Sequence, residues 1–155
     1  MLYLLIAVAI FGVDMYMKQH IEKTKELGHK EMLFGKKVIL RKAHNTGAML
    51  NLMEKKQAFV AKFSLGVSIV LAIYYLWLLM RKGNSMLKLG LSFLIGGAGS
   101  NVYDRFKRKY VVDYFSFNVK WEKLRNIVFN LADIFIFAGA LIVVLAKGFR
   151  QDKAT

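Results

Sequence analysis

IVFNLADIFIFAGALIVVLA, residues 127–146, is an apolar run of membrane-spanning length that contains one aspartate, Asp133. About 20 predominantly apolar residues are enough to cross a bilayer as a helix. An acidic side chain at the centre of such a helix costs roughly 2.5 to 3.5 kcal/mol on insertion scales, so an acid here is a functional-site candidate. This stretch therefore predicts a membrane helix that carries part of a polar site.

Three further hydrophobic stretches predict a membrane protein with four spans. They are Leu2–Met17, Phe63–Met80 and Leu89–Tyr103. The chain is 56% hydrophobic and 22% charged, so its charges must be concentrated in the connections between helices. Four spans account for roughly half of the 155 residues. We therefore expect an all-α integral membrane protein with four transmembrane helices, forming a single polytopic domain over residues 1–155.

The connection between the first two spans is the longest polar segment, residues 18–58. It contains the β-like run Lys37–Arg41 and then the turn-forming group Asn45-Thr-Gly47. These features predict a small extramembrane β-containing segment between helices one and two. The short connection Arg81–Ser85 instead predicts a tight turn, which makes helices two and three antiparallel neighbours.

The composition excludes several kinds of site. Without cysteine the chain has no disulfides, thiolate nucleophiles or cysteine metal ligands. The histidines, His20, His29 and His44, lack metal-ligand spacing, so we expect no metal and no cofactor. The net charge is +14, but the basic residues lie beside membrane segments. Anionic lipid headgroups, at about 1 kcal/mol per Lys or Arg, are therefore the expected partner, and nucleic acid is not.

Charge also bears on orientation. Residues 18–62 and 105–125, on one side of the predicted membrane, hold 18 Lys and Arg, whereas the other side holds six. The positive-inside rule taken alone places the more basic side in the cytoplasm and the termini outside.

Polar residues recur on the two last predicted helices. The cluster Gly96–Ser100 consists of small residues and predicts close approach of a neighbouring helix. Each helix then carries three polar residues at helical spacing, which predicts that they line one face. These residues are Asn101, Asp104 and Arg105 on the third helix, and Asn126, Asn130 and Asp133 on the fourth.

Asp113 and Asp133 are expected near the same membrane edge, where they would form a carboxylate pair. Two carboxyls in a low-dielectric site do not both ionise easily, so one keeps a proton while the other acts as a base. The base activates a water and the protonated partner polarises a scissile carbonyl, which is the chemistry of an aspartic protease. No serine lies in a G-x-S-x-G setting, so covalent catalysis has little support.

Each polar residue also has a structural interpretation. Asp104 and Arg105 would then form ion pairs with other partners, and Asp14 with Lys18 would form a structural pair or an anchor at the membrane interface. Asp133 alone would be a helix-packing hydrogen-bond group.

Five ordered motifs resemble those of the lipoprotein signal peptidases, also called signal peptidase II. They are Asp14-x-x-x-Lys18, Asn45-x-Gly47-Ala48, Gly96-Gly97-Ala98-x-x-Asn101-x-x-Asp104-Arg105, Val111-Val112-Asp113-Tyr114-Phe115 and Phe129-Asn130-x-Ala132-Asp133. The resemblance implies a membrane aspartic endopeptidase that removes the signal peptide from diacylglyceryl-modified prolipoproteins, cutting before the lipidated cysteine. It also implies residence in the bacterial cytoplasmic membrane, with cytoplasmic termini and a site that opens to the outer leaflet, against the charge count.

The same resemblance implies roles for individual residues. Asp113 and Asp133 fall on the catalytic pair. Asn101, Arg105 and Asn130 fall on positions that support the pair, and Asn45 falls on a substrate-contacting position. A structural role is expected for the polar residues Asp14, Lys18 and Asp104.

Several positions depart from the family pattern. Leu50 stands in place of an aromatic residue, and Lys109 and Ser100 stand in place of glycines. The chain also lacks the proline expected before Phe129-Asn130, since it has no proline at all. A divergent paralogue and an enzyme of narrow specificity therefore stay open. Two further alternatives are a catalytically silent relative that binds lipidated precursors and a small channel or transporter, which buried acids also permit.

Overall fold

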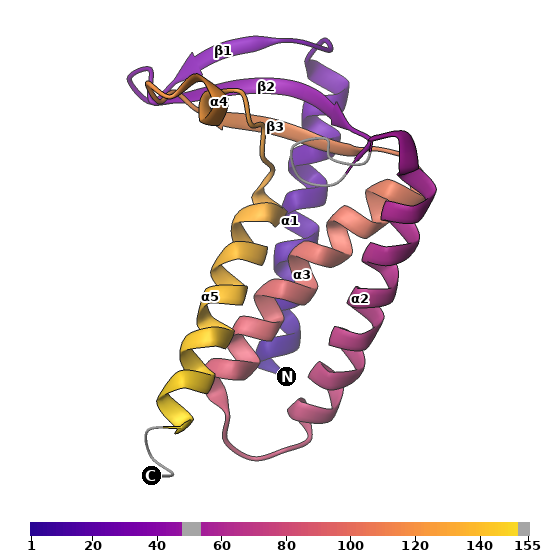
Figure 1. The fold of residues 1–155 in the computed structure, drawn as a ribbon, viewed down its shortest axis with the longest axis vertical. Helices are drawn as coiled ribbons and strands as arrows, with labels where there is room; N and C mark the ends of the chain where they lie inside the picture. Colours follow the sequence, from indigo (N-terminus) through magenta and orange to yellow (C-terminus); the bar gives the residue numbers. More distant parts are fainter. Residues whose placement is uncertain (48–53, 152–155) are drawn as a thin grey trace.

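Four long helices stand side by side, and a small sheet lies across one end of them (Figure 1). The computed structural model describes residues 1–47 and 54–151, so Ala48 and Leu50 lie outside the described residues. The elements are α1 (Leu2–Thr24), β1 (Lys30–Leu33), β2 (Val38–Asn45), η2 (Glu54–Lys56), α2 (Gln57–Leu79), α3 (Ser85–Lys107), β3 (Val111–Phe117), α4 (Glu122–Arg125) and α5 (Leu131–Gln151). The chain is thus mostly helical, as the hydrophobic stretches predict.

Three of the long helices have the length and composition of membrane spans. They are α1, α2 and the part Leu131–Gly148 of α5. Their outward side chains are apolar, for example Phe63 and Val70 on α2, which are both more than 60% exposed. Exposed apolar surface of this extent suits lipid rather than water. These helices indicate a multi-pass membrane protein.

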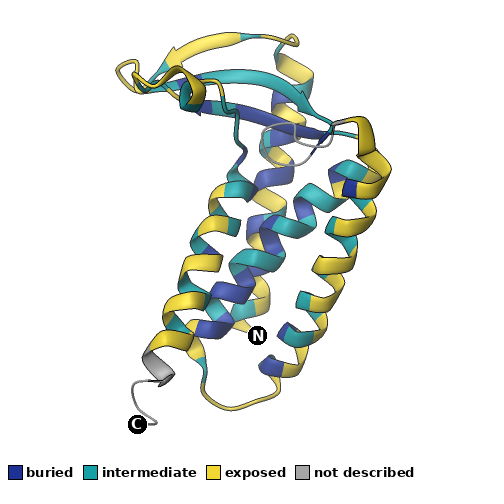
Figure 2. Ribbon diagram, in the orientation of Figure 1, coloured by how far each residue is buried: buried dark blue, intermediate teal, exposed yellow. Residues whose placement is uncertain are grey.

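The helix α3 is as long as the others but is more polar, and it does not meet the same composition criterion. It packs against α1, α2 and α5, and Figure 2 shows that it carries many of the buried positions. Because protein rather than lipid surrounds α3, its polar side chains can find partners there. The fourth transmembrane span therefore stays a prediction.

The sheet differs from the predicted one in its third strand. Strands β1 and β2 lie between the first two helices as predicted, but β3 follows α3 and completes an antiparallel sheet in the order β1-β2-β3. Asp113 is therefore a strand residue, and the all-α description is incomplete. The register shifts between Leu40 and Ala43, so that Ala43 pairs with Asp113 and Asn45 with Val111. This pairing places Asn45 beside Asp113.

The predicted start of the last helix is wrong by four residues. Phe129 exchanges backbone hydrogen bonds with Phe115, with its N–H donating at 2.7 Å and its carbonyl accepting at 3.0 Å. That bridge keeps Phe129 extended, so α5 begins only at Leu131. Asn126 caps the short α4 instead, and consequently Asn126, Asn130 and Asp133 do not line one helical face. The first helix also continues past Met17, to Thr24.

Lys109 lies in the connection between α3 and β3 with a φ of 71°. This left-handed backbone conformation costs an L-residue about 1 to 2 kcal/mol and costs glycine almost nothing. The departure from glycine at this position is therefore a substitution against the local backbone preference.

Glycines let α3 approach its neighbours, as the small-residue cluster predicts. A Cβ on Gly96 would lie 2.6 Å from the carbonyl oxygen of Ala7 in α1, and one on Gly97 would lie 2.6 Å from that of Ala132 in α5. Both distances are shorter than real Cβ contacts, so only glycine permits this packing. The contact at Ala132 also fixes the backbone next to Asp133.

Gly97→Ala is expected to destabilise the fold by about 1 to 3 kcal/mol, because the added methyl forces α3 and α5 apart. Gly66→Ala is the matched control, since a Cβ there meets nothing within 4 Å. Thermal unfolding of the two variants in the same detergent measures the difference. Equal melting temperatures would show that the close approach of α3 and α5 does not limit stability.

Candidate functional site

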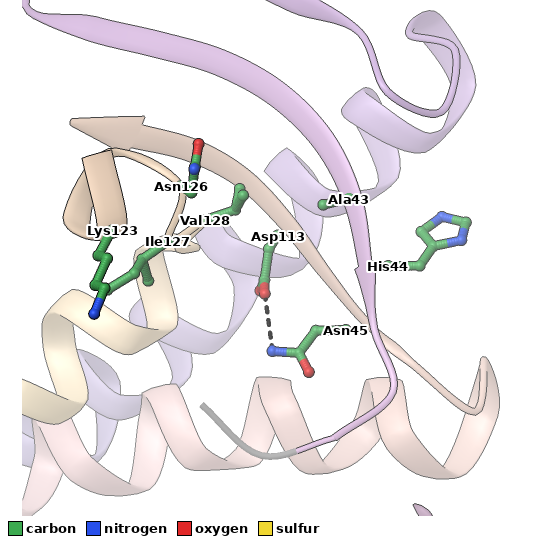
Figure 3. A pocket seen from close by; sticks show the side chains of 8 residues that line it. All are labelled: Ala43, His44, Asn45, Asp113, Lys123, Asn126, Ile127 and Val128. Carbon is green, nitrogen blue, oxygen red and sulfur yellow. Dashed lines mark hydrogen bonds between the residues drawn. The ribbon is translucent and has the colours of Figure 1, made fainter. Parts of the chain in front are cut away.

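Asp113 is held by two asparagines from different parts of the chain. Its Oδ2 accepts a hydrogen bond of 3.1 Å from Asn45 Nδ2, and its Oδ1 accepts one of 2.7 Å from Asn130 Nδ2. Figure 3 shows Asn45 and Asp113 pointing toward one another, whereas His44 points away. The carboxyl is buried, with 4% of the residue exposed. The strand β3 thus presents one acid to the start of α5.

Asp133 lies in the first turn of α5, where Asn130 is the residue before the helix. Asp133 Oδ2 accepts the Asn130 backbone N–H at 3.0 Å, and Asn130 Oδ1 accepts the Asp133 backbone N–H at 2.9 Å. This reciprocal pair is a capping box, a motif that satisfies N–H groups at a helix start. Asn101 Nδ2 on α3 donates to the other oxygen, Asp133 Oδ1, at 2.9 Å. The helix start therefore fixes the second acid.

Asn130 joins the two acids, because its side chain bonds Asp113 while its backbone bonds Asp133. Burial, and after it the negative charge of nearby Asp133, raises the pKa of Asp113 to about 7. Near neutral pH the Asp113 carboxyl therefore exchanges between its protonated and ionised forms. Such a pair offers an acid and a base at the same place and the same pH.

Two cavities adjoin the acids. One, of about 210 Å³, is lined by polar and apolar residues together: Asn45, Asn101, Arg105, Val111, Asp113, Val128, Phe129, Asp133, Ile136 and Phe137. The other, of about 290 Å³, is lined by Asp113, Asn45 and the segment that includes Lys123 and Asn126 (Figure 3). Asp133 is only partly buried, so it is accessible from the first cavity.

Arg105 lies beside the acids without bonding either of them. Its guanidinium donates a 2.8 Å hydrogen bond to the Gly47 carbonyl oxygen, which ties α3 to the end of β2. Among the described residues, its Nε is buried without a hydrogen-bond partner. Arg105 also lines the 210 Å³ cavity, so its guanidinium is placed beside a bound molecule there.

Asp14, Lys18 and Asp104 form a fully buried charge cluster behind the acids. Lys18 Nζ lies 2.7 Å from Asp14 Oδ2 and 3.5 Å from Asp104 Oδ2, and Arg108 lies 2.6 Å from Asp104 Oδ1. Asp104 also accepts the backbone N–H of Val112, next to Asp113, at 3.1 Å. The cluster therefore braces both α3 and β3.

Two contributors were not among the candidates from the sequence. The Tyr114 hydroxyl donates to Asp14 Oδ1 and accepts the Leu131 N–H, both at 2.9 Å. Ser100 Oγ donates to Asp14 Oδ2 at 2.6 Å. Tyr114 sits 100 residues from Asp14, so no local pattern reveals the contact. The Asn130-x-x-Asp133 spacing, by contrast, is a readable cap signal that the helical-face interpretation overlooked.

Within residues 1–47 and 54–151, no group of three or more His, Asp or Glu side chains is placed to hold a metal ion. His44 instead bonds Glu22 at 2.7 Å and stacks on Tyr110, with ring centroids 3.8 Å apart. The polar site is thus built from carboxylates, carboxamides and one guanidinium.

Comparison with known proteins places this arrangement in a family. Two solved structures titled as bacterial membrane enzymes share the fold. The structure at 2.3 Å resolution has a TM-score of 0.83 and 22% sequence identity, and the match covers 99% of this chain and 91% of the chain in that structure. The other, at 1.9 Å, has a TM-score of 0.76 at 23% identity over 93% of this chain and 90% of its own.

Sequence relatives are more specific. The "Lipoprotein signal peptidase" of Clostridioides difficile (strain 630) is 30% identical over 154 residues, which cover 99% of each chain. That of Alteromonas mediterranea is 33% identical over 115 residues, which span 71% of this chain but only 60% of the relative. The profile described as "Signal peptidase (SPase) II" matches residues 6–149. Because that match runs through all four long helices and the sheet, the chain belongs to the signal peptidase II family.

Proposed function

We propose that this protein is a membrane aspartic endopeptidase that removes the signal peptide from diacylglyceryl-modified prolipoproteins, cutting before the lipidated cysteine. The observation that carries the proposal is the joining of Asp113 and Asp133 through Asn130 at the wall of a cavity. The names of the relatives supply the substrate class.

The chemistry follows from the shared proton. The ionised carboxylate removes a proton from a water, and the resulting nucleophile attacks the scissile carbonyl. The protonated carboxyl donates a hydrogen bond to the carbonyl oxygen as negative charge develops there. The proton taken from water then passes to the leaving amine, which completes hydrolysis. Asn101 and Asn130 orient the carboxyls with neutral amides, so they add no charge that would alter the proton count.

The cavity beside the acids suits a lipidated peptide. Asn45, Asn101 and Arg105 line its polar part and provide groups that bond a peptide backbone. Ile136 and Phe137 line the part along α5, and Phe137 is 51% exposed on the membrane-facing helix. An acylated segment could therefore enter sideways from the bilayer with its chains along α5.

The placement in the membrane is part of the proposal. With 23 residues, α3 is about 34 Å long at 1.5 Å per residue, enough to be the fourth span. The N-terminus and the end of α5 lie away from the sheet (Figure 1). We place that end in the cytoplasm of a bacterial cell, and the acids and the sheet at the outer leaflet. The basic residues on the sheet side would contact anionic headgroups there.

Cleavage of a defined precursor tests the proposal. Purified protein in lipid nanodiscs should cut a diacylglyceryl-modified prolipoprotein immediately before its modified cysteine, and it should leave the unmodified precursor intact. Mass spectrometry of both products locates the cut. Stable binding of the modified precursor without any cut would support the silent relative instead. Ion flux in liposomes that disappears with Asp133→Asn would support the channel.

A further inference from the structure

Lys18 is a buried cation, fully enclosed on α1 and linked to the acid pair by a side-chain contact. Its ammonium donates hydrogen bonds to Asn101 Oδ1 at 2.8 Å and to Ser100 Oγ at 3.1 Å, in addition to its ion pairs with Asp14 and Asp104. Asp14, Ser100 and Asn101 thus provide acceptors for the three N–H groups of the ammonium. Among these three acceptors, Asn101 is the one that also bonds a member of the acid pair.

Asn101 connects the ammonium to Asp133. Its oxygen accepts from Lys18, and its nitrogen donates to Asp133 Oδ1 at 2.9 Å. A cation at the oxygen of an amide polarises the amide and strengthens the bond that its N–H donates. The other oxygen of Asp133 accepts a backbone N–H at the start of α5, where the helix dipole favours negative charge. Both partners of Asp133 thus stabilise its anion.

Asp113 has a different environment. Within the part of the chain that the structure describes, its two donors are the side-chain amides of Asn45 and Asn130, and neither amide bonds a cation. The strand β3 supplies no helix dipole. Asp113 is also the more enclosed acid, whereas Asp133 is partly accessible. Burial and the Asp133 charge raise the pKa of Asp113 to about 7.

Other charged groups also lie near the acid pair. Arg105 on α3 lines the cavity shared by both acids and bonds the Gly47 carbonyl. Lys123 on α4 lines the cavity next to Asp113 and is exposed, so water screens its charge. Asp14 is paired with Lys18 at 2.7 Å. None of these groups forms a hydrogen-bonded connection to only one acid, as Lys18 does through Asn101.

We propose that Lys18 acts through the Asn101 carboxamide to keep Asp133 ionised, so that Asp113 holds the proton of the pair. Asp133 is then the base that activates water and Asp113 is the acid that polarises the carbonyl. These two roles rest on the proposed function, whereas the location of the proton does not. Lys18 is a positioning residue, because it touches no reacting atom.

An NMR titration locates the proton without any substrate. The chain contains five aspartates, so protein labelled with ¹³C at the aspartate carboxyl gives few resonances. One resonance should titrate near pH 7. This resonance should be absent from Asp113→Asn. In Asp133→Asn it should remain but titrate at a lower pH, because the negative charge of Asp133 next to Asp113 is gone. A resonance near pH 7 that persists in Asp113→Asn and vanishes in Asp133→Asn overturns the assignment, whether or not the protein cleaves prolipoproteins.

The role of Lys18 has a separate readout in the pH profile of kcat/KM. Lys18→Met should move the acidic limb of the profile to higher pH by about one unit, because the anionic base loses its cation. The double variant Asp14→Asn, Lys18→Met removes one negative and one positive charge from the buried cluster. It replaces the single variant in this experiment if Lys18→Met alone does not fold. Lys88→Met is the control, since Lys88 is a buried lysine that bonds Arg81 away from the acids. If the acidic limb of the kcat/KM profile stays at the same pH in a folded Lys18 variant, the proposed role of Lys18 is wrong.

Discussion

Asp113→Asn and Asp133→Asn are each expected to lower kcat for prolipoprotein cleavage by about 10²- to 10⁴-fold, the usual contribution of a general acid or base. Under the proposed mechanism each variant removes a group that exchanges a proton, while the cavity proposed to hold the substrate keeps its shape. KM should therefore change much less than kcat. Single-turnover cleavage of one diacylglyceryl-modified precursor by both variants measures the loss.

Asp113→Asn should still fold, and the pH dependence of its stability is the control for the loss of activity. The pKa of Asp113 rises from its ordinary 3.8 to about 7 on folding, so the folded state binds more protons than the unfolded state between these values. Stability then falls as pH rises from about 4 to 7 and is flat above. Asp113→Asn removes this dependence and should melt at least as high as the unchanged protein at pH 8. Near-normal turnover in either folded variant would contradict the dyad.

The sequence predicts the helices well because membrane spans are local patterns. Each of the four hydrophobic stretches overlaps a long helix, and two of them, Leu2–Met17 and Leu89–Tyr103, lie wholly within one. The start of α5 was misplaced because the backbone pairing of Phe129 with Phe115 is not visible in the apolar run. The capping spacing of Asn130 and Asp133 was visible and would have placed the helix start correctly.

The strand β3 was harder to predict. Val111–Phe117 is a short apolar run, and length alone does not separate a strand from a helical turn. Its partner, β2, lies more than 60 residues earlier. The bonds around the acids are equally distant, for example Lys18 with Asn101, 83 residues apart. Motif resemblance could place these residues in one site, but which atoms meet depends on tertiary packing.

Asp14→Asn is expected to give the second large effect, a loss of stability of about 3 to 5 kcal/mol, which corresponds to a melting temperature lower by on the order of 10 °C. Asp14 is fully buried and its carboxylate accepts four hydrogen bonds. The donors are Lys18, Ser100, Tyr114 and the backbone N–H of Ala132. An amide replaces one acceptor oxygen by a donor and leaves the buried ammonium without its nearest counter-charge.

Two comparisons separate the causes of that loss. Glu31→Gln breaks the exposed pair with Lys25, 2.9 Å apart, and should leave the melting temperature unchanged because water screens such pairs. Combining Asp14→Asn with Lys18→Met removes both charges and should recover much of the stability if the unpaired ammonium is the main cost. If the double variant melts as low as Asp14→Asn alone, the cost instead lies in the bonds from Asp14 to Tyr114 and Ala132. The start of α5 would then be the element that fails, and cleavage should fall together with stability, because Asp133 is fixed by that same turn.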